Sequence, residues 1–420
     1  MRILIVNTSE RTGGAAVAAN RLTEALNNNG VKAKMLVRDK QTDDITTSSL
    51  PASWRLRWNF LWERFIIWQH NGFSRKDLFA VDLANAGTDI TRLPEFREAD
   101  IIHLHWVNQG MLSLNGIKKI LASGKPVVWT MHDMWPCTGI CHHARECNGF
   151  HNECGQCWLL RFPKDKDLSH KVFIKKQQAY SVARIHFVTC SHWLEDLARK
   201  SNLLHDHDVR TIHNALDTSL FKPDDILSAR EQLGLPTDKK LILFGAVKST
   251  DKRKGIDYFI EACRLLVQRY QMLKEEVGIV VFGNHADELQ TLLPFPVYSL
   301  GYIHSECEMA NVYNAVDMYV TPSLEENLPN TIAEAQACGK PCVGFRIGGI
   351  PEMIDHKENG YVAEYRDAED FAFGIHWILK EADTAALHEA AYKKAVASYS
   401  QSQVAKQYIQ LYEEILKENG

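Results

Sequence analysis

The stretch 318–352, MYVTPSLEENLPNTIAEAQACGKPCVGFRIGGIPE, constrains the fold more than any other part of the chain. Its apolar runs and turn residues predict a buried strand over 318–322, a loop, a short helix over about 328–338 and a second strand over 342–345. Gly339 follows the helix as a C-terminal stop. Strand, helix and strand in this order form one β-α-β unit, which places its ligand beyond the carboxyl end of the first strand.

Two carboxylates frame this ligand position. Glu326 lies in the loop and Glu334 lies on the helix, with seven residues between them. Pro329 falls in the first helical turn, whose unpaired N–H groups favour a phosphate. Carboxylates would repel a bare anion but would accept hydrogen bonds from sugar or ribose hydroxyls. A single glutamate is more often a solvated residue with a nearby partner, whereas the whole constellation indicates a nucleotide sugar, which carries both kinds of group.

These residues resemble glycosyltransferase family 4, through the Glu-x7-Glu spacing, the PSLEENLPN loop, the AEAQACGKPCVGF segment and the GGIPE turn. The resemblance implies the α/β fold called GT-B, in which two Rossmann-like, doubly wound parallel-sheet domains face each other across a cleft. It implies that Glu326 contacts the donor sugar near its reacting carbon and that Glu334 binds the ribose hydroxyls. The residues that it places near the donor diphosphate are Asn327, Leu328, Pro329 and Asn330.

A chain of 420 residues is too long for one core of the usual size, so two domains are expected. We place them at 1–218 and 219–402, with the first completed by a C-terminal helix over 403–416. A hydrophobic content of 45%, a charged content of 24% and a net charge of −4 are those of an ordinary soluble protein, and they give no reason to expect nucleic-acid binding. The opening apolar run predicts a strand and not a signal peptide, so we expect a cytoplasmic protein.

The first domain opens with a strand over 2–7, a loop that contains Gly13 and Gly14, and a helix over about 15–28. The loop lacks the spacing of the dinucleotide-binding motif, so it is weak evidence for dinucleotide binding. According to the resemblance, the two glycines let the acceptor or the diphosphate approach the backbone. A tight turn that requires a positive φ explains them equally well.

Two later strands, over 99–106 and 125–133, end in polar side chains at the same carboxyl edge of the predicted sheet. His105 can shape an acceptor pocket. His132 and Asp133 match the His-Asp pair that family 4 has at this position, where the histidine faces the donor sugar. An isolated histidine at a strand end would equally be a structural residue, but the match favours a catalytic function for His132.

Five of the ten cysteines lie between 137 and 157. Four of them have the spacing Cys-x5-Cys-x6-Cys-x2-Cys, and thiolates suit a tetrahedral structural zinc ion. The irregular gaps leave free thiols or disulfides equally open. We expect no catalytic metal, because the family stabilises its leaving group without one. With the HDMWP sequence before it, the insertion resembles that of a branch that synthesises bacterial polysaccharides. The four predicted zinc ligands are Cys141, Cys147, Cys154 and Cys157.

The second domain restarts the strand-loop-helix pattern at 241–245 and continues into the basic loop 246–255. Lysine and arginine between a strand and a helix can neutralise a departing diphosphate. Lys254 matches the lysine of the family's basic pair, and Lys248 and Arg253 are both candidates for its displaced arginine. Tyr302 follows a shorter strand, where the resemblance places the nucleobase.

Residues 53–70, SWRLRWNFLWERFIIWQH, predict a helix with a strip of aromatic and apolar side chains and interspersed arginines. Such a helix can lie on an anionic bilayer at the inner face of the cell membrane, as in family members that use lipid-linked acceptors. The alternative, which we favour on sequence alone, is a helix docked on its own domain with arginine stems covering apolar surface.

The sequence therefore predicts a retaining glycosyltransferase of bacterial surface polysaccharide synthesis. It would move a sugar from a nucleotide-sugar donor to a saccharide or lipid-linked saccharide acceptor. A GT-B phosphorylase, an epimerase or a nucleotide-sugar-binding protein without activity are the alternatives.

Overall fold

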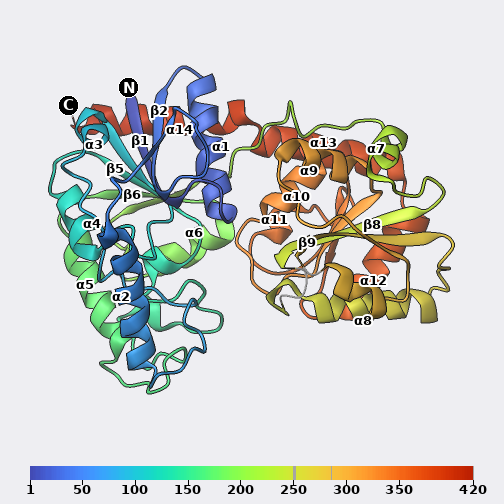
Figure 1. The fold of residues 1–420 in the computed structure, drawn as a ribbon, viewed down its shortest axis with the longest axis horizontal. Helices are drawn as coiled ribbons and strands as arrows, with labels where there is room; N and C mark the ends of the chain where they lie inside the picture. The colour runs from blue at the N-terminus through green and yellow to red at the C-terminus, as the bar shows by residue number, and fades with distance from the viewer. Residues whose placement is uncertain (249–251, 285, 420) are drawn as a thin grey trace. The chain divides into compact units, whose positions relative to one another are not determined.

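The computed structural model describes residues 1–248, 252–284 and 286–419. Its residues form two compact units. Unit 1 comprises Met1–Ala215 and Val404–Gly420, and unit 2 comprises Leu216–Gln403. Each unit is a parallel sheet covered by helices on both faces (Figure 1). The predicted α/β fold with two Rossmann-like parallel sheets is thereby confirmed.

Unit 1 contains a seven-stranded sheet in the order β3-β2-β1-β4-β5-β6-β7, in which every neighbouring pair is parallel. The order reverses between β1 and β4, and a doubly wound sheet binds ligands at such a point. Its strands are β1 (Arg2–Ser9), β2 (Lys32–Asp39), β3 (Thr47–Ser49), β4 (Ile101–Leu104), β5 (Val127–Met131), β6 (Ile185–Thr189) and β7 (Asp208–Thr211). Its helices are α1 (Gly14–Asn28), α2 (Trp54–His70), α3 (Pro94–Glu98), α4 (Leu114–Leu121), α5 (Leu168–Tyr180), α6 (His192–Arg199) and α14 (Gln401–Asn419), with short turns η1 (Trp135–Cys137) and η2 (Gly149–His151).

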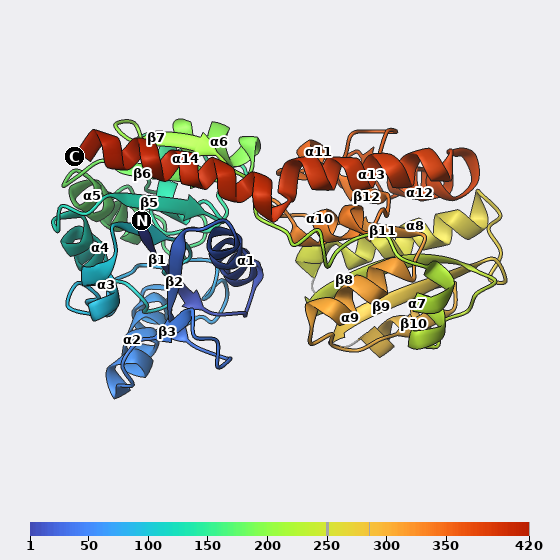
Figure 2. The same cartoon turned by 90° about the horizontal axis from the view of Figure 1, so that it is seen from above.

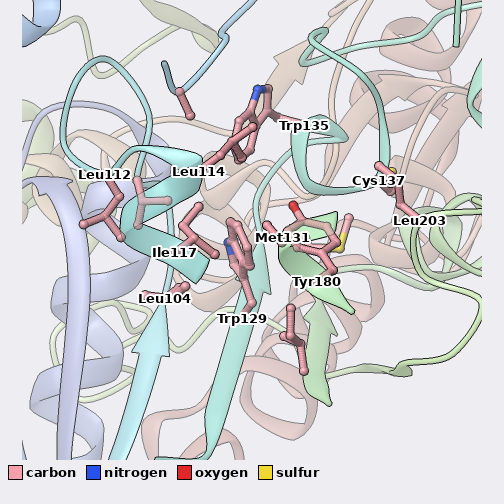
Figure 3. Packing of buried hydrophobic residues seen from close by; sticks show 14 of the residues in the cluster. Leu104, Leu112, Leu114, Ile117, Trp129, Met131, Trp135, Cys137, Tyr180 and Leu203 are labelled. Carbon is pink, nitrogen blue, oxygen red and sulfur yellow. The ribbon is translucent and has the colours of Figure 1, made fainter. Parts of the chain in front are cut away.

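One face of this sheet packs on aromatic and aliphatic side chains around Trp129 of β5 (Figure 3). The Trp129 ring lies 5.8 Å from the ring of Tyr180 on α5 and 5.8 Å from that of Phe187 on β6. Every residue of β5 is buried, as expected for a central strand of a parallel sheet. This packing fixes the carboxyl end of β5, where His132 and Asp133 follow.

The other face is closed by α1 and by the C-terminal helix α14, the red ribbon over this sheet in Figure 2. Val404, Tyr408 and Leu411 of α14 are buried against strand residues such as Ile5 and Val188. The last helix of the chain is therefore part of the core of the unit that the first strand begins.

Unit 2 contains a six-stranded parallel sheet in the order β10-β9-β8-β11-β12-β13, with the reversal between β8 and β11. Its strands are β8 (Lys240–Lys248), β9 (Val277–Asn284), β10 (Val297–Ser299), β11 (Met318–Thr321), β12 (Cys342–Phe345) and β13 (Gly360–Ala363). Its helices are α7 (Ile226–Leu233), α8 (Ile256–Gln268), α9 (Glu306–Asn314), α10 (Asn330–Ala337), α11 (Ile350–Met353), α12 (Ala368–His376) and α13 (Thr384–Tyr399), with the short elements η3 (Lys252–Lys254), η4 (Ala286–Thr291) and η5 (Trp377–Glu381).

The helix after β11 begins later than predicted. Pro329 precedes α10 as its N-cap residue with an extended backbone, φ −68° and ψ 117°, and Asn330 is the first helical residue. Pro329 therefore lies just before the first helical turn and not within it, so this part of the prediction is wrong. The segment 327–329 instead continues the loop that carries Glu326.

Helix α2 docks on its own unit, as the favoured prediction has it, but most of its aromatic strip does not face the core. Its aromatic strip faces solvent, with 73% of Trp54 and 53% of Trp58 exposed, while Glu63, Arg64 and Ile67 are buried. The docked interpretation is therefore wrong for the aromatic side chains. None of the described helices has the length and apolar composition needed to cross a bilayer.

Candidate functional site

The carboxyl ends of β8 and β11 lie side by side at the reversal point of the unit 2 sheet, where open α/β sheets bind their ligands. The segment after β8 leads to η3 and Lys254, and the loop after β11 carries Glu326. The topology thus brings the predicted basic loop and the predicted carboxylate to one edge of one sheet.

The loop after β11 lies against two glycine turns. The N–H of Leu324 donates to the carbonyl of Arg253 at 2.8 Å, and the N–H of Gly349 donates to the carbonyl of Asn327 at 2.7 Å. Gly255 and Gly348 have φ values of +72° and +58°, and a methyl group on either would overlap a carbonyl oxygen, that of Pro322 or that of Glu326. Only glycine allows this close approach, so the two turns fix the backbone on either side of Glu326.

Lys254 and Glu326 form a salt bridge between Nζ and Oε1. The Glu326 side chain is 15% exposed and the Lys254 side chain 38% exposed, so the pair borders solvent. A cation and a carboxylate in contact at a ligand-binding edge can act on two parts of one substrate: the ammonium on a phosphate and the carboxylate on a sugar.

Helix α10 follows Glu326 closely in the sequence, and its N-cap residue Pro329 makes no side-chain capping hydrogen bond. Glu334, in the second turn, is buried and accepts a hydrogen bond of 2.9 Å from the hydroxyl of Tyr313 on α9. Burial and the adjacent Glu334 carboxylate raise the pKa of Tyr313 well above its ordinary value, so this hydroxyl keeps its proton. Glu334 is therefore a buried, oriented carboxylate and not a solvated surface residue.

The other residues predicted to bind the donor have fewer contacts that fix their positions. Arg253 is exposed and contributes its carbonyl to the loop contact described above. Lys248 ends β8, and its side chain lies outside the described residues. Tyr302 follows β10, is 51% exposed, and its ring lies 5.0 Å from that of His304.

In unit 1, Gly13 caps α1 with φ +92°, and Gly14 is the first residue of the helix. A methyl group on Gly13 would meet no described atom within 4 Å, so backbone conformation and not crowding requires glycine there. This agrees with the tight-turn explanation for Gly13, whereas Gly14 is not among the glycines with a positive φ.

His105 and His132 follow directly after β4 and β5 and lie in hydrogen-bond contact, with 2.9 Å between Nδ1 of His105 and Nε2 of His132. The ring of His103 lies 4.4 Å from that of His105, and its nitrogens bond to Tyr412 Oη at 2.7 Å and Thr130 Oγ1 at 2.8 Å. Burial lowers the pKa of His103 to about 3, that of His132 to about 4 and that of His105 well below its ordinary value. The three imidazoles are therefore neutral at physiological pH.

Asp133 is held by groups of its own unit. Its Oδ2 accepts from Trp106 Nε1 at 2.9 Å and from His142 Nδ1 at 2.7 Å, and its Oδ1 accepts from the N–H of Trp135 at 2.8 Å. His142 lies 2.7 Å from the Asp82 carboxylate through its other nitrogen. Although burial opposes the charged form, the two carboxylates raise the pKa of His142 to about 10.

The cysteine pattern has no metal-binding geometry in this structure. Within the described ranges, no group of three or more His, Cys, Asp and Glu residues could hold a metal ion, which leaves the predicted zinc site without support. Sγ of Cys154 instead accepts the N–H of Gly139 at 3.2 Å, and Sγ of Cys147 accepts that of Gly149 at 3.5 Å. Burial raises the pKa of Cys141 to about 12, which favours the neutral thiol. All four predicted ligands (Cys141, Cys147, Cys154 and Cys157) are free thiols.

Three residues, Tyr313 in unit 2 and Asp82 and His142 in unit 1, have contacts that the sequence did not indicate. Tyr313 lies on a helix whose apolar pattern indicates only a core position. Asp82 and His142 are 60 residues apart, and no spacing rule connects them. The positive φ of Gly348 could have been predicted from the Gly-Gly pair of the GGIPE turn, because glycine pairs mark positions that need an unusual backbone conformation.

Two family models match different parts of this chain. The model described as Glycosyltransferase Family 4 matches residues 12–220, and the model described as Glycosyl transferases group 1 matches residues 238–381. Among curated proteins, the chain is 30% identical over 176 residues to D-inositol 3-phosphate glycosyltransferase of Saccharomonospora viridis. That match covers 39% of this chain and 40% of the relative, so the chain spans about two fifths of that protein's length.

Solved structures with the same fold match almost the whole chain. Sucrose-phosphate synthase from Thermosynechococcus elongatus has a TM-score of 0.65 at 19% identity, with 99% of each chain covered. HepE of Anabaena, solved in complex with UDP and glucose, has a TM-score of 0.63 at 16% identity, with 99% of this chain and 100% of that chain covered. Because the two family models together account for most of both units, the chain belongs to glycosyltransferase family 4.

Proposed function

We propose that the protein is a retaining glycosyltransferase that moves a sugar from a nucleotide-sugar donor to a hydroxyl acceptor. The observation that carries the proposal is the Lys254–Glu326 pair at the reversal point of the unit 2 sheet. Family membership supports it, and so does the similarity in fold to HepE, which was solved with UDP and glucose bound.

In the proposed reaction, the bond between the anomeric carbon and the diphosphate oxygen breaks while the acceptor oxygen bonds to the same face of that carbon. The acceptor proton passes to the departing phosphate oxygen. Lys254 and the N-terminus of α10 stabilise the charge that develops on the diphosphate. Glu326 orients the sugar as it gains oxocarbenium character. Glu334, fixed by Tyr313, binds the ribose hydroxyls.

The other predicted residues keep their proposed roles. We assign unit 2 to the donor, with Arg253, Lys248 and residues 327–330 at the diphosphate and Tyr302 at the base. We assign unit 1 to the acceptor, with Gly13, Gly14 and His105 on that side and His132 as a catalytic residue. Asp133 has its carboxylate oxygens bonded within its own unit, which favours a positioning role over acceptor binding.

Thermal stability in the presence of nucleotide sugars tests donor binding. A donor at 100 times its Kd stabilises the folded chain by about 2.7 kcal/mol. We expect the correct donor and its free nucleotide to raise the Tm, and the donor to be hydrolysed slowly without acceptor. NMR of the product would establish retention. Binding without hydrolysis or transfer would instead identify a nucleotide-sugar-binding protein. Phosphate-dependent cleavage would identify a phosphorylase, and a donor with altered stereochemistry an epimerase.

We also propose that α2 contacts an anionic membrane, which fits a lipid-linked saccharide acceptor and a role in bacterial surface polysaccharide synthesis. The support is the exposed strip Trp54, Trp58, Leu61, Trp62 and Phe65, of which each side chain is at least 40% exposed. Arg55 and Arg57, also exposed, alternate with it and match anionic headgroups. Tryptophan and arginine on one exposed helix are the composition of an interfacial anchor.

Sedimentation with vesicles tests the membrane contact. We expect the full chain to sediment with phosphatidylglycerol vesicles and to be released by salt, because the arginine attraction is screened. The double variant W58S/W62S should lose this binding while retaining donor hydrolysis. Replacement of Trp158, exposed but outside α2, with serine is the control. Equal binding by the wild type and W58S/W62S would rule out the proposed surface.

A further inference from the structure

A buried chain of charged side chains connects α2 to Asp133, the residue that directly follows His132. Arg64 of α2 pairs with Asp82, Asp82 lies 2.7 Å from His142, and His142 lies 2.7 Å from Asp133. Glu63 extends the chain at the α2 end, where its Oε1 accepts the N–H groups of Leu83 at 2.8 Å and Ala84 at 2.6 Å. Asp82, Glu63 and Arg64 are each at least 94% buried.

His142 has the central place in this chain because both of its nitrogens face carboxylate oxygens. Each must donate a proton to make these two bonds, so the ring acts as a cationic bridge between Asp82 and Asp133. Its ring also lies 5.8 Å from the indole of Trp106, whose Nε1 donates to the same Asp133 oxygen. Asp133 Oδ2 therefore accepts hydrogen bonds from both the His142 imidazole, in the cysteine-rich insertion, and the Trp106 indole, which follows β4.

We infer that His142 is a positioning residue, which holds Asp133 in the rotamer that fixes the Trp106 indole and the backbone after His132. Without this bridge, Asp133 would keep its bonds to Trp106 and to the N–H of Trp135, but its Oδ2 would lose its cationic partner. Charge-assisted hydrogen bonds of this kind orient a side chain more strongly than neutral ones do. A small displacement of His132 would follow, and a displaced catalytic group costs turnover more than ground-state binding.

This inference rests on the proposed function for its kinetic part and on geometry alone for its structural part. The experiment therefore has two readouts. The first is turnover and donor KM of the full chain, and the second is the NMR signal of the Trp106 indole N–H, assigned with a W106F variant.

For H142Q we expect kcat to fall about 10- to 100-fold with donor KM unchanged, because unit 2 is untouched. We also expect the Trp106 indole N–H signal to shift. E63Q is the matched control: it alters the same buried chain at the end that does not touch Asp133, and it should leave both kcat and the indole signal near their wild-type values. D82N, which keeps the His142–Asp133 bond but removes the outer carboxylate, should give a smaller loss of kcat and a smaller shift, and it replaces H142Q if that variant does not fold.

An unshifted Trp106 signal in H142Q, or equal kcat losses in H142Q and E63Q, would overturn the inference and leave His142 a purely structural residue. Absence of transfer or hydrolysis by the wild type with every nucleotide sugar would instead refute the proposed function. The indole signal would still decide whether His142 positions Asp133.

Discussion

Glu326 lies on a loop whose backbone touches Gly255 on one side and Gly348 on the other, and its carboxylate pairs with Lys254. The pairing partners come from two different strand ends, β8 and β11, so the site depends on the register of two neighbouring strands. At the scale of single residues, the position of Glu326 thus depends on a few backbone contacts as much as on its charged partner.

The two glutamates should respond differently to substitution. In the proposed mechanism, E326Q removes the charge beside the reacting sugar, so we expect kcat to fall about 100-fold with donor affinity little changed. In the same mechanism, E334A removes hydrogen bonds to the ribose, so we expect the donor Kd to rise about 10- to 100-fold. Steady-state kinetics and calorimetry with the donor measure the two quantities, and E325Q is the control. Equal losses of kcat and affinity in both variants would contradict this division of roles.

Gly348 should be the least replaceable glycine of the loop. G348A combines a positive φ with overlap of the Glu326 carbonyl, and we expect a loss of unfolding free energy of about 4 kcal/mol or more, together with lost turnover. Gly234 has a similar φ of +64° but no described atom within 4 Å, so G234A should cost only about 1–2 kcal/mol. Urea unfolding of both variants measures the difference. Similar costs would show that the contact with Glu326 is unimportant.

The sequence predicted the placement of Lys254, Glu326, His105 and His132 because parallel strands end at one edge of a sheet, and strand ends are visible in apolar runs. It did not predict the glycine contacts of the loop, because they depend on distances between segments that are far apart in the chain. The sequence also did not predict the contacts of His142, because its insertion has irregular spacing and its two carboxylate partners come from different segments. Burial of Glu334 against Tyr313 likewise depends on how α9 and α10 pack.

Helix α2 shows at the scale of an element why periodicity alone did not indicate the buried face. The apolar strip is the solvent-exposed one, and the buried side is anchored by ionic groups, Glu63 and Arg64, with Ile67. Burial and the nearby Asp82 carboxylate raise the pKa of Glu63 to about 7, although Arg64 lies 3.5 Å from its Oε2 and opposes the shift. A charged helix face can be buried only where partners such as Asp82 exist, and these partners lie in another segment.

Substitutions of apolar residues on the two faces of α2 should therefore differ in their cost to stability. W54A, on the exposed face, should change the free energy of unfolding by about 0.5 kcal/mol or less. I67A, fully buried, should cost about 2–5 kcal/mol. Urea unfolding followed by circular dichroism compares them. A large destabilisation by W54A would mean that the aromatic strip is covered by protein.

At the scale of the whole molecule, unit 1 contains a cluster of neutral histidines at the carboxyl edge of its sheet. His103 and His105 are 0% and 3% exposed, and both have folded-state pKa values far below the 6.5 of an unfolded chain. A lowered pKa means that the unfolded state binds more protons below pH 6.5. Stability from these groups is thus present above pH 6.5 and lost as the pH falls toward the folded-state values.

At pH 5, His103 should destabilise the fold by about 2 kcal/mol relative to pH 7, because the unfolded chain gains about 1.36 kcal/mol for each of roughly 1.5 pH units below its pKa. His105 should act in the same direction. Hydrogen exchange of peptides from β4 and β5 at both pH values reports the effect on unit 1 separately. H103N should reduce the acid sensitivity, whereas H205N, at an exposed position, should not. An identical pH dependence in H103N and the wild type would contradict the prediction.

The return of α14 to the first sheet has a consequence for biosynthesis. Tyr412 bonds to His103, and Tyr408 bonds to Thr130 at 2.9 Å, so residues that follow unit 2 in the sequence complete contacts with strands that precede it. On the ribosome, the sheet of unit 1 would keep one face uncovered until α14 has been made, while the intervening unit can fold first. Premature termination just before Val404 would release a chain whose later half is intact and whose earlier half lacks its cover.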